Sequence, residues 1–373
     1  MSNFFSNLFN TVTNKKSPSV LGIDIGSSSI KIVQLTRKNG HAILETYGKL
    51  ALGPYSGKDI GVATSLSVDK IIEAVSDVLK EKEVNITTKL CGVAIPFSSS
   101  FISVIEMPTM APKQLESMIP IEARKYIPVP ITEVALDWYV IPKDKNDDNQ
   151  DPNEKPAAQK LEVLVVAIHN DTILRYKDIV EKNALDASFF EIEIFSTMRS
   201  ILDQELSPIL IIDMGATSTK IYMVERGILR SSHMIGRGSQ SITDELSKSF
   251  GISVTEAEAL KIEKGLMGEI GGIKVKDVVT LTLGYIFSEA NRVVLTYQKK
   301  YNKNVAKAVL VGGGSALKGV TEIAKNNFQI EVVTGDPFSK AVAPAFLEKV
   351  LHETGPEFAV AMGVALRRLQ ELD

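Results

Sequence analysis

The stretch "VLGIDIGSSSIKIVQL", residues 20–35, places an aspartate, a glycine, three serines and a lysine between two apolar runs. A similar stretch, "LIIDMGATSTKIYMVERG", begins at residue 210. In both, the lysine follows the aspartate by seven residues, Asp24 to Lys31 and Asp213 to Lys220. Each stretch predicts two strands joined by a tight polar turn. Two copies of the pattern in one chain indicate two related halves that face one ligand.

Composition limits the classes of protein that fit. A chain of 373 residues exceeds the usual size of a single core, which favours a bilobed or two-domain structure. The net charge of −3 argues against a nucleic-acid partner. Cys91 is the only cysteine and the four histidines show no metal-ligand spacing, which fits a protein of the reducing cytoplasm. We find neither a signal peptide nor an apolar run long enough to cross a bilayer.

The first sixteen residues, "MSNFFSNLFNTVTNKK", form an amphipathic pattern. Five apolar residues share one face of a helix, and two lysines follow: Phe4, Phe5, Leu8, Phe9, Val12, Lys15 and Lys16. This pattern is typical of a segment that rests on a membrane surface, of a helix packed on protein, and of a frayed tail. The sequence leaves these three interpretations open.

Strand and helix patterns give the order of elements in the first half. Strands are predicted at 19–36 and 41–50, and a helix follows Ser67 as its N-cap. A strand, a helix and two more strands follow within residues 97–169, and "SFFEIEIF" (188–195) is a further strand. The polar stretch 143–160 is predicted to be a long solvated hairpin loop.

The second half repeats the opening pattern. Strands are predicted at 209–214, 219–225 and 228–235, before a mostly helical stretch at 239–303. A strand, a helix, a short strand and a terminal helix complete the chain. Its Gly-rich stretch "VLVGGGSALKGV" (309–320) has a strand, a turn and the start of a helix. It does not fit the dinucleotide or P-loop fingerprints.

The residue types in the two hairpins suit a phosphorylated ligand with a metal ion. Backbone N–H groups of a tight turn and serine hydroxyls donate to phosphate, and a lysine supplies a positive charge. An aspartate beside phosphates suits Mg²⁺ held largely through water. The candidates are Asp24, Gly26, Ser27, Ser28 and Lys31 in the first copy, and Asp213, Gly215, Ala216 and Thr217 in the second. Taken alone, either copy is also typical of an ordinary hairpin with a polar turn.

These elements together resemble the superfamily of actin, Hsp70 and the sugar kinases. "IDIGSSSIK" is similar to its first phosphate motif, "IIDMGATSTK" to its second, and "VLVGGGSALKGV" to its adenosine motif, with Gly312, Gly313 and Gly314. The resemblance runs from Ser19 onward, and it implies an α/β, bilobed actin-like fold that binds ATP with Mg²⁺.

Three further site residues follow from the same resemblance. "TEAEALKIEKG" (255–265) is similar to a helix of bacterial actins that contacts ribose and purine, which implicates Glu258 and Lys261. An ordinary solvated helical charge pair is the alternative. "EIEIFSTM" (191–198) lies where these folds carry a residue that orients water or Mg²⁺, which points to Glu193 as the one catalytic candidate. An exposed carboxylate at a strand end is the alternative there.

The inserted unit identifies the branch of the superfamily. It resembles subdomain 1C of the cell-division protein FtsA and of the PilM family. "PIEARKYIPVPITEVALDW" (120–138), "DPF" (336–338) and "EFAVAMGVALRR" (357–368) resemble the PilM family in particular. The expected division is an N-terminal segment 1–18, lobe 1A at 19–96 and 170–207, subdomain 1C at 97–169, lobe 2A at 208–238 and 304–373, and subdomain 2B at 239–303.

Membership of this family implies a cytoplasmic, ATP-binding component of the type IV pilus platform. It would hold the cytoplasmic N-terminal peptide of a PilN-type protein in a groove between 1A and 1C. It would link the inner-membrane complex to the pilus motor ATPases, with peripheral membrane association only, and self-association stays open. The aromatic residues Tyr126, Trp138 and Tyr139 suit either the core of the insert or this peptide site.

Three alternatives remain at this stage. The first is an FtsA-like division protein, but we expect no FtsA-type linker and membrane helix after Leu369. The second is a sugar-kinase-type phosphotransferase, for which residues 97–110 offer Glu106 but no aspartate. The third is an ATPase chaperone, which needs a peptide-binding β-domain that we do not expect here. Phosphoryl transfer to water needs a positioned nucleophile, and Glu193 is the only candidate to orient one. Hydrolysis of ATP is therefore expected to be slow at most.

Overall fold

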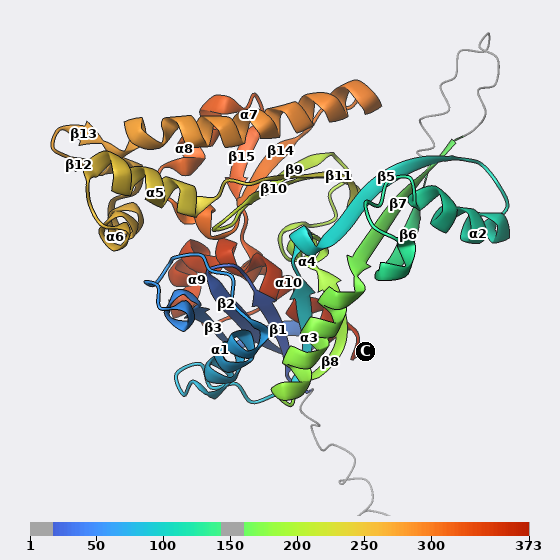
Figure 1. The fold of residues 1–373 in the computed structure, drawn as a ribbon, viewed down its shortest axis with the longest axis horizontal. Coiled ribbons are helices and arrows are strands. Elements are labelled where there is room, and N and C mark those ends of the chain that lie inside the picture. The colour runs from blue at the N-terminus through green and yellow to red at the C-terminus, as the bar shows by residue number, and fades with distance from the viewer. Residues whose placement is uncertain (1–17, 143–159, 373) are drawn as a thin grey trace, which may run out of the picture.

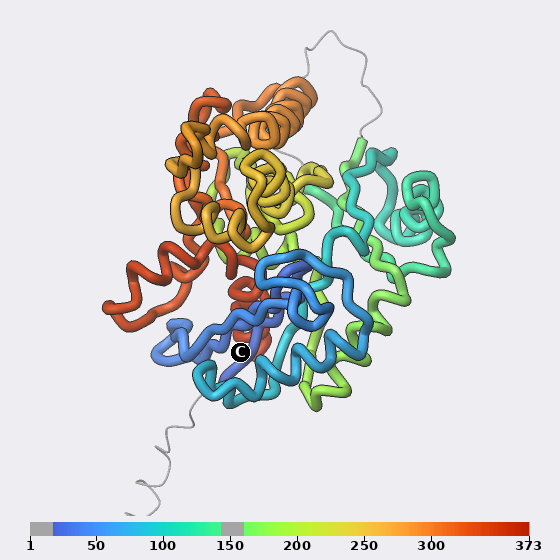
Figure 2. Tube along the Cα trace, turned by 60° about the vertical axis from the view of Figure 1, so that its left-hand side comes forward, coloured from blue at the N-terminus to red at the C-terminus, as the bar shows by residue number. Residues whose placement is uncertain are grey.

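The computed structural model describes residues 18–142 and 160–372. The amphipathic N-terminal pattern and all but the last residue of the 143–160 loop lie outside this range. The described chain forms two lobes, with a smaller unit beside them (Figure 1). Figure 2, turned from that view, shows the same separation.

Each lobe is built on a five-stranded sheet of the same topology. The first has the order β3-β2-β1-β4-β8 and the second the order β11-β10-β9-β14-β15. The strands of the first are β1 (Val20–Ile25), β2 (Ser29–Lys38), β3 (His41–Ala51), β4 (Leu90–Ile95) and β8 (Asp186–Ile192). Those of the second are β9 (Ile209–Met214), β10 (Thr219–Glu225), β11 (Ile228–Ile235), β14 (Lys307–Val311) and β15 (Glu331–Thr334). The expectation of an actin-like bilobed fold is confirmed.

The seven-residue spacing is explained by the register of the two hairpins. β1 and β2 are antiparallel with Asp24 directly opposite Lys31. β9 and β10 are antiparallel with Asp213 directly opposite Lys220. Each hairpin therefore presents an acid–base pair next to its turn, as side chains of opposed residues lie on the same face of a sheet.

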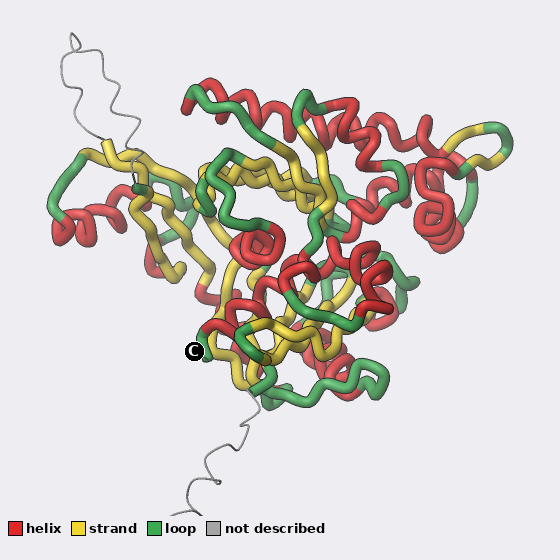
Figure 3. The backbone as a smooth tube through the Cα atoms, turned by 180° about the vertical axis from the view of Figure 1, so that it is seen from behind, coloured by secondary structure: helices red, strands yellow, loops and turns green. Residues whose placement is uncertain are grey.

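Helices cover both faces of each sheet (Figure 3). In the first lobe, α1 (Val68–Lys80) and α3 (Asn170–Lys182) pack on one face, and α10 (Ala359–Gln370) packs on the other. In the second lobe, the core of one face includes α5 (Ser239–Phe250), α6 (Val254–Lys264), α7 (Val275–Tyr301) and α8 (Val320–Asn327). Its other face packs on α4 (Glu193–Ile201). The remaining helix of the lobes is α9 (Glu348–Thr354).

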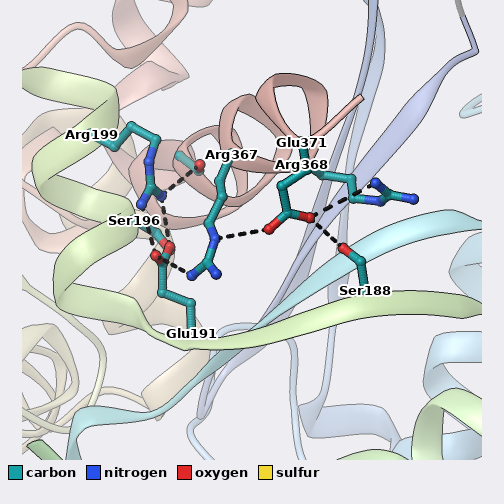
Figure 4. A network of polar contacts seen from close by, with 8 residues as sticks. Ser188, Glu191, Ser196, Arg199, Arg367, Arg368 and Glu371 are labelled. Carbon is teal, nitrogen blue, oxygen red and sulfur yellow. Dashed lines mark hydrogen bonds and ion pairs between the residues drawn. The ribbon is translucent and has the colours of Figure 1, made fainter. Parts of the chain in front are cut away.

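Helices α4 and α10 therefore lie between the two sheets, and they contact each other closely. A Cβ atom on Gly363 of α10 would lie 1.8 Å from the carbonyl oxygen of Ser196 on α4, so a larger residue is excluded there. Next to this contact, Glu191 of β8 binds three polar partners (Figure 4). Its carboxylate accepts from Arg199 at 2.7 Å, Arg367 at 2.8 Å and Ser196 at 2.7 Å. The terminal helix is thus fixed to the first lobe by packing and by charge.

The inserted unit is a three-stranded sheet with one helix. It comprises β5 (Ser100–Pro108), α2 (Pro112–Ala123), β6 (Val134–Ile141) and β7 (Lys160–His169), in the sheet order β5-β7-β6. One face forms a core with α2, against which Trp138 packs half-buried. On the other face, Ile141 and Leu164 join a core that contains α4 and the second-lobe sheet. The insert therefore contacts both lobes.

The structure corrects three details. The strand predicted at 188–195 ends at Ile192, and a helix that the sequence did not predict begins at Glu193. The stretch 239–303 contains a two-stranded hairpin, β12 (Glu269–Ile270) and β13 (Ile273–Lys274), because two glycines allow its turn. The terminal helix, grouped by sequence with 304–373 in the second lobe, packs its apolar face on the first-lobe sheet.

Helix α7 is long and apolar enough to cross a membrane by length and composition, which the sequence reading did not anticipate. Its buried residues include Leu283, Ile286, Phe287 and Ala290, all of which belong to the second-lobe core. Packing within the protein therefore explains part of the apolar composition of α7, whereas Leu281 and Leu295 of the same helix are exposed.

The buried network around Glu191 gives a test of how the terminal helix is held. We expect Glu191→Gln to lower the free energy of unfolding by about 2–4 kcal/mol, because Arg199 and Arg367 lose their shared carboxylate. Urea unfolding at pH 7 measures this. Glu371→Gln is the control, since its contact with Arg367 is exposed and is worth less than about 1 kcal/mol. Equal losses in the two variants would contradict the proposed role of Glu191.

The same carboxylate predicts a pH dependence. Burial raises the pKa of Glu191, but hydrogen bonds and charge from Arg199, with Ser196 and Arg367, outweigh it and hold this pKa below its usual value. The resulting stabilisation is present above the unfolded pKa of about 4.3 and is lost as the pH falls through the lower folded value. The difference between wild type and Glu191→Gln should therefore shrink below about pH 4.

Candidate functional site

The turns of the two Asp–Lys hairpins meet between the lobes. Each turn closes with a backbone hydrogen bond of 3.0 Å, from Gly26 N–H to the carbonyl of Ser29 and from Gly215 N–H to the carbonyl of Ser218. Across the gap, the hydroxyl of Thr217 donates to that of Ser27 at 3.3 Å. The two related halves of the chain thus face each other through equivalent turns.

A single cavity of about 870 Å³ opens at this meeting point. All fifteen residues singled out from the sequence line it: Asp24, Gly26, Ser27, Ser28, Lys31, Glu193, Asp213, Gly215, Ala216, Thr217, Glu258, Lys261, Gly312, Gly313 and Gly314. Its volume lies within the range of about 300–1,000 Å³ usual for small-molecule and cofactor sites. Residues from five separate parts of the sequence are therefore brought to one site.

A cluster of charged side chains lies where the two hairpins approach each other. Lys220 Nζ lies 2.7 Å from Glu193 Oε2 and 3.3 Å from Asp213 Oδ2. Lys31 Nζ lies 3.7 Å from Asp24 Oδ2. These side chains are largely buried, and three carboxylates share two ammonium groups. If every group is ionised, the cluster therefore has a net charge of about −1.

Burial shapes the protonation of this cluster. Burial raises the pKa of Asp24, with Lys31 opposing the rise, and raises the pKa of Glu193, with Lys220 opposing it. Burial alone would lower the pKa of Lys220, but Asp213 and Glu193 raise it above its ordinary value. Lys220 is therefore protonated at neutral pH. An added cation near the carboxylates would stabilise their charged forms.

Glu193 differs from the exposed strand-end carboxylate that the sequence left open. It is the first residue of α4 and is only 7% exposed. Its Oε1 accepts from the backbone N–H of Phe97 at 2.7 Å, while Oε2 is bound to Lys220. Each oxygen of the carboxylate therefore has a hydrogen-bond partner within the protein.

Glu258 and Lys261 are a helical ion pair, but they are not a freely solvated one. The ammonium of Lys261 is 2.6 Å from Glu258 Oε2 and 2.8 Å from the hydroxyl of Thr243. Lys261 is buried, and this burial lowers its pKa despite the charge of Glu258. Both side chains line the cavity, from the side of α6.

The Gly-rich turn lies directly against the second hairpin. Gly312 has a φ of +81°, and a Cβ there would lie 2.4 Å from Asp213 Oδ1. Its N–H donates to the carbonyl of Pro356 at 2.8 Å. A side chain at this position would fill the cradle between Asp213 and the cavity, so glycine is required by space as well as by backbone angle.

The cavity also contains residues that were not chosen from the sequence. Lys220 could have been chosen from the sequence, because its spacing from Asp213 repeats that of Lys31 from Asp24. Lys49 and Glu357 form an ion pair at 2.6 Å on the cavity wall, but they are 308 residues apart and carry no sequence signal. Outside the cavity lining, the hydroxyl of Thr255 donates to Asp59 at 2.5 Å, which joins α6 to a loop of the first lobe.

These residues fit a nucleoside triphosphate with a divalent cation. Lys31 and Lys220 would supply positive charge for phosphates, and Asp24 and Asp213 would supply oxygens for a metal ion. Within residues 18–142 and 160–372, no group of three or more His, Cys, Asp or Glu is arranged to hold a metal ion by itself. Mg²⁺ would therefore take its other ligands from phosphate and water, as it commonly does.

The kinase alternative gains no support from Glu106. This carboxylate lies on β5 of the insert, 3.0 Å from Lys160 and 3.4 Å from Lys300, and it is not among the residues that line the cavity. Its ion pair with Lys300 instead joins the insert to α7.

Comparison with known proteins adds independent findings. The sequence model of the family described as type IV pilus assembly protein PilM matches residues 22–369. The cell division protein FtsA of Neisseria meningitidis serogroup B is 25% identical over 322 residues, which covers 77% of each protein. FtsA of Escherichia coli K12 is 20% identical over 359 residues, or 86% of this chain and 84% of FtsA.

Solved structures agree on the fold. That of a PilM-PilN type IV pilus biogenesis complex has a TM-score of 0.75 and 21% identity, and covers 94% of this chain and 98% of that one. MreB5 of Spiroplasma citri bound to ADP has a TM-score of 0.51 and 10% identity, with 95% and 97% covered. Both are similar to this chain along nearly its whole length.

The charged cluster predicts the effect of removing one carboxylate. We expect Asp24→Ala to weaken the binding of Mg-ATP by about tenfold or more, because one oxygen for the metal shell is lost. The fold should be retained, since burial already disfavours the charged form of Asp24. Calorimetric titration measures the affinity.

Asp186→Ala is the matched control, because Asp186 is exposed at the start of β8 and does not line the cavity. It should bind Mg-ATP as the wild type does. An Asp24→Ala variant that binds as tightly as this control would sink the assignment of Asp24 to the metal.

Proposed function

The chain belongs to the PilM family of type IV pilus assembly proteins, and from this premise we propose that it is an ATP-binding, actin-like adaptor of the pilus assembly platform. The observation that carries the nucleotide part is the single cavity between the lobes, in which all fifteen chosen residues meet. The adaptor would act in the cytoplasm at the inner membrane, and would link a PilN-type membrane partner to the pilus motor ATPases.

In this proposal, residues of both lobes hold Mg-ATP. The turns at 26–28 and 215–217, with Lys31 and Lys220, bind the phosphates, and Asp24 and Asp213 hold Mg²⁺ through water. The bound metal neutralises phosphate charge. Gly312, Gly313 and Gly314 accept the adenosine against their backbone, while Glu258 and Lys261 contact ribose and purine.

The nucleotide serves mainly to stabilise the closed arrangement of the lobes. A ligand that contacts both halves binds the closed state better than the open one, and so shifts the population by mass action. Direct contacts already join the lobes: Thr217 donates to Ser27 at 3.3 Å, and the N–H of Ala63 donates to Gln240 Oε1 at 3.1 Å. A bound ligand would add to these contacts.

The engagement of Glu193 predicts slow hydrolysis. Phosphoryl transfer to water needs a positioned nucleophile as well as a phosphate cradle. Glu193 is the catalytic candidate, and its oxygens are bound to Phe97 N–H and Lys220. We therefore expect the isolated protein to release phosphate slowly or not detectably in a steady-state assay with Mg-ATP. Rapid turnover that Glu193→Gln abolishes would show instead that the protein is an enzyme in its own right.

The insert supports the peptide-binding part of the proposal. Tyr139 on β6 is 51% exposed and lies on the sheet face away from α2. On that face, Val166 and Ile168 of β7 pack toward the first lobe and α4. The amide of Asn170, at the start of α3, donates to the carbonyl of Thr132, so insert and first lobe meet beside β6. An extended peptide in this region would gain backbone hydrogen bonds and apolar contacts.

We expect Tyr139→Glu to weaken binding of a PilN-type N-terminal peptide by about tenfold or more, because a charge replaces an apolar ring in the groove. Anisotropy of the fluorescently labelled peptide measures this, with a scrambled peptide for comparison. Tyr285→Glu is the matched control, since Tyr285 is 47% exposed on α7 of the second lobe. Equal affinity of the two variants would mean that the peptide site lies elsewhere.

A further inference from the structure

A second cavity, of about 550 Å³, lies beside β3. Its walls include Tyr47, Lys49, Val84, Pro344, Leu347 and Phe358. β3 is at one edge of the first-lobe sheet, and β8 is at the other. The cavity is therefore at the opposite edge of the sheet from β8, and none of the residues that line it belongs to the insert. It is distinct from the peptide groove proposed above.

The backbone of β3 offers hydrogen-bonding groups to this cavity. Leu52 N–H donates to the carbonyl of Ser28, and the register with β2 continues from there. Since alternate residues of an antiparallel strand face the partner, Gly48 and Leu50 turn their backbone groups toward β2. Tyr47, Lys49 and Ala51 turn theirs outward. No other described strand pairs with this edge in the sheet order.

The neighbouring part of the β3 edge is already paired with another segment of the chain. Leu44 N–H donates to the carbonyl of Val342 at 2.9 Å, and Val342 N–H donates to that of Ala42 at 2.8 Å, in a parallel bridge. The ladder stops at Pro344, which has no N–H to donate. Figure 2 shows this segment, in red, projecting beside the blue strands of the first lobe. Beyond it, β3 has a β-bulge at Glu45, after which the edge continues along the cavity.

Both sheet faces are covered beside the open edge. On one face, the hydroxyl of Thr46 donates to the carbonyl of Val84 at 2.6 Å, which holds the 83–84 loop against the strand. On the other face, the ring of Tyr47 packs on that of Phe358, with centroids 5.3 Å apart. An added strand would therefore find apolar walls for side chains on each of its two faces, as in known strand-addition sites.

The two ends of the cavity differ in charge. At one end, the ion pair of Lys49 and Glu357 separates it from the nucleotide cavity, which both residues also line. At the other end, Glu45 and Glu83 are exposed carboxylates on the rim. A basic residue at that end of an added peptide would meet two acids.

We propose that this groove binds a short extended segment of a partner protein as a sixth strand of the first-lobe sheet. The segment runs parallel to β3, in line with Val342, and carries a lysine or arginine near its N-terminal end for Glu45 and Glu83. Its side chains alternate between the two faces of the sheet. Apolar side chains on one face pack on Val84, and those on the other face pack on Leu347 and Phe358. The inference goes beyond the function proposed above and does not depend on nucleotide.

The probe is a fluorescein-labelled hexapeptide of sequence KVTVIL, which has apolar side chains on both faces of a strand, added to the full-length protein. We expect saturable anisotropy below about 1 mM, and at least about a tenfold weaker response for an analogue N-methylated on alternate residues, which lacks the donors to β3. Absence of binding up to about 1 mM overturns the proposal. Equal binding of the N-methylated analogue overturns it as well.

A pair of variants tests the backbone pairing from the side of the protein. Lys49→Pro removes the outward N–H of β3, whereas Lys49→Ala keeps it, and both remove the ammonium. We expect Lys49→Pro to bind the hexapeptide about tenfold or more weakly than Lys49→Ala, with folding checked by thermal unfolding. Equal binding by two folded variants contradicts strand addition at this edge. If Lys49→Pro does not fold, the N-methylated analogue on the wild type decides.

A second copy of the chain is the competing occupant. Sedimentation of the protein at rising concentration, with and without the hexapeptide, distinguishes the two. A monomer throughout agrees with a partner segment. A concentration-dependent dimer that the hexapeptide dissociates would overturn the assignment to a partner protein.

Discussion

The buried ammonium of Lys220 sets the constraint on which the two-lobed structure depends. A charge removed from water must be paired, and Lys220 is paired with Asp213 of its own hairpin and with Glu193 at the start of α4. Because α4 leads out of the first-lobe sheet and Lys220 lies in the second, this cluster fixes one lobe relative to the other. The same cluster forms the charged part of the cavity.

Packing of the helices carries this constraint to the rest of the chain. α4 contacts the second-lobe sheet, α10 contacts the first-lobe sheet, and the two helices touch at Gly363. The insert shares a core with α4 and also pairs Glu162 with Arg230 of β11 at 2.9 Å. A change in how the lobes close would therefore shift the contacts of the insert. A nucleotide held between the lobes, as proposed, would in this way affect a partner bound at the insert.

The sequence predicted those parts of the fold that depend on local patterns. The aspartate-to-lysine spacing gave the hairpins, whose register places Asp24 opposite Lys31. The strand-helix-strand-strand order of the insert is also as predicted. The start of α4 was missed because residues 188–195 alternate like a strand, and only the tertiary contacts of Glu193 show where the strand ends. The lobe to which α10 belongs is likewise a matter of long-range packing, as Gly363 on Ser196 illustrates.

The central claim is that the cavity between the two hairpins holds Mg-ATP. A crystal structure of the full chain, grown with Mg²⁺ and a non-hydrolysable ATP analogue, tests it most directly. Our account predicts the phosphates between residues 26–28 and 215–217, the metal beside Asp24 and Asp213, and the purine near Gly313. A saturating analogue that leaves this cavity without nucleotide, or that binds at another place on the protein, would contradict it.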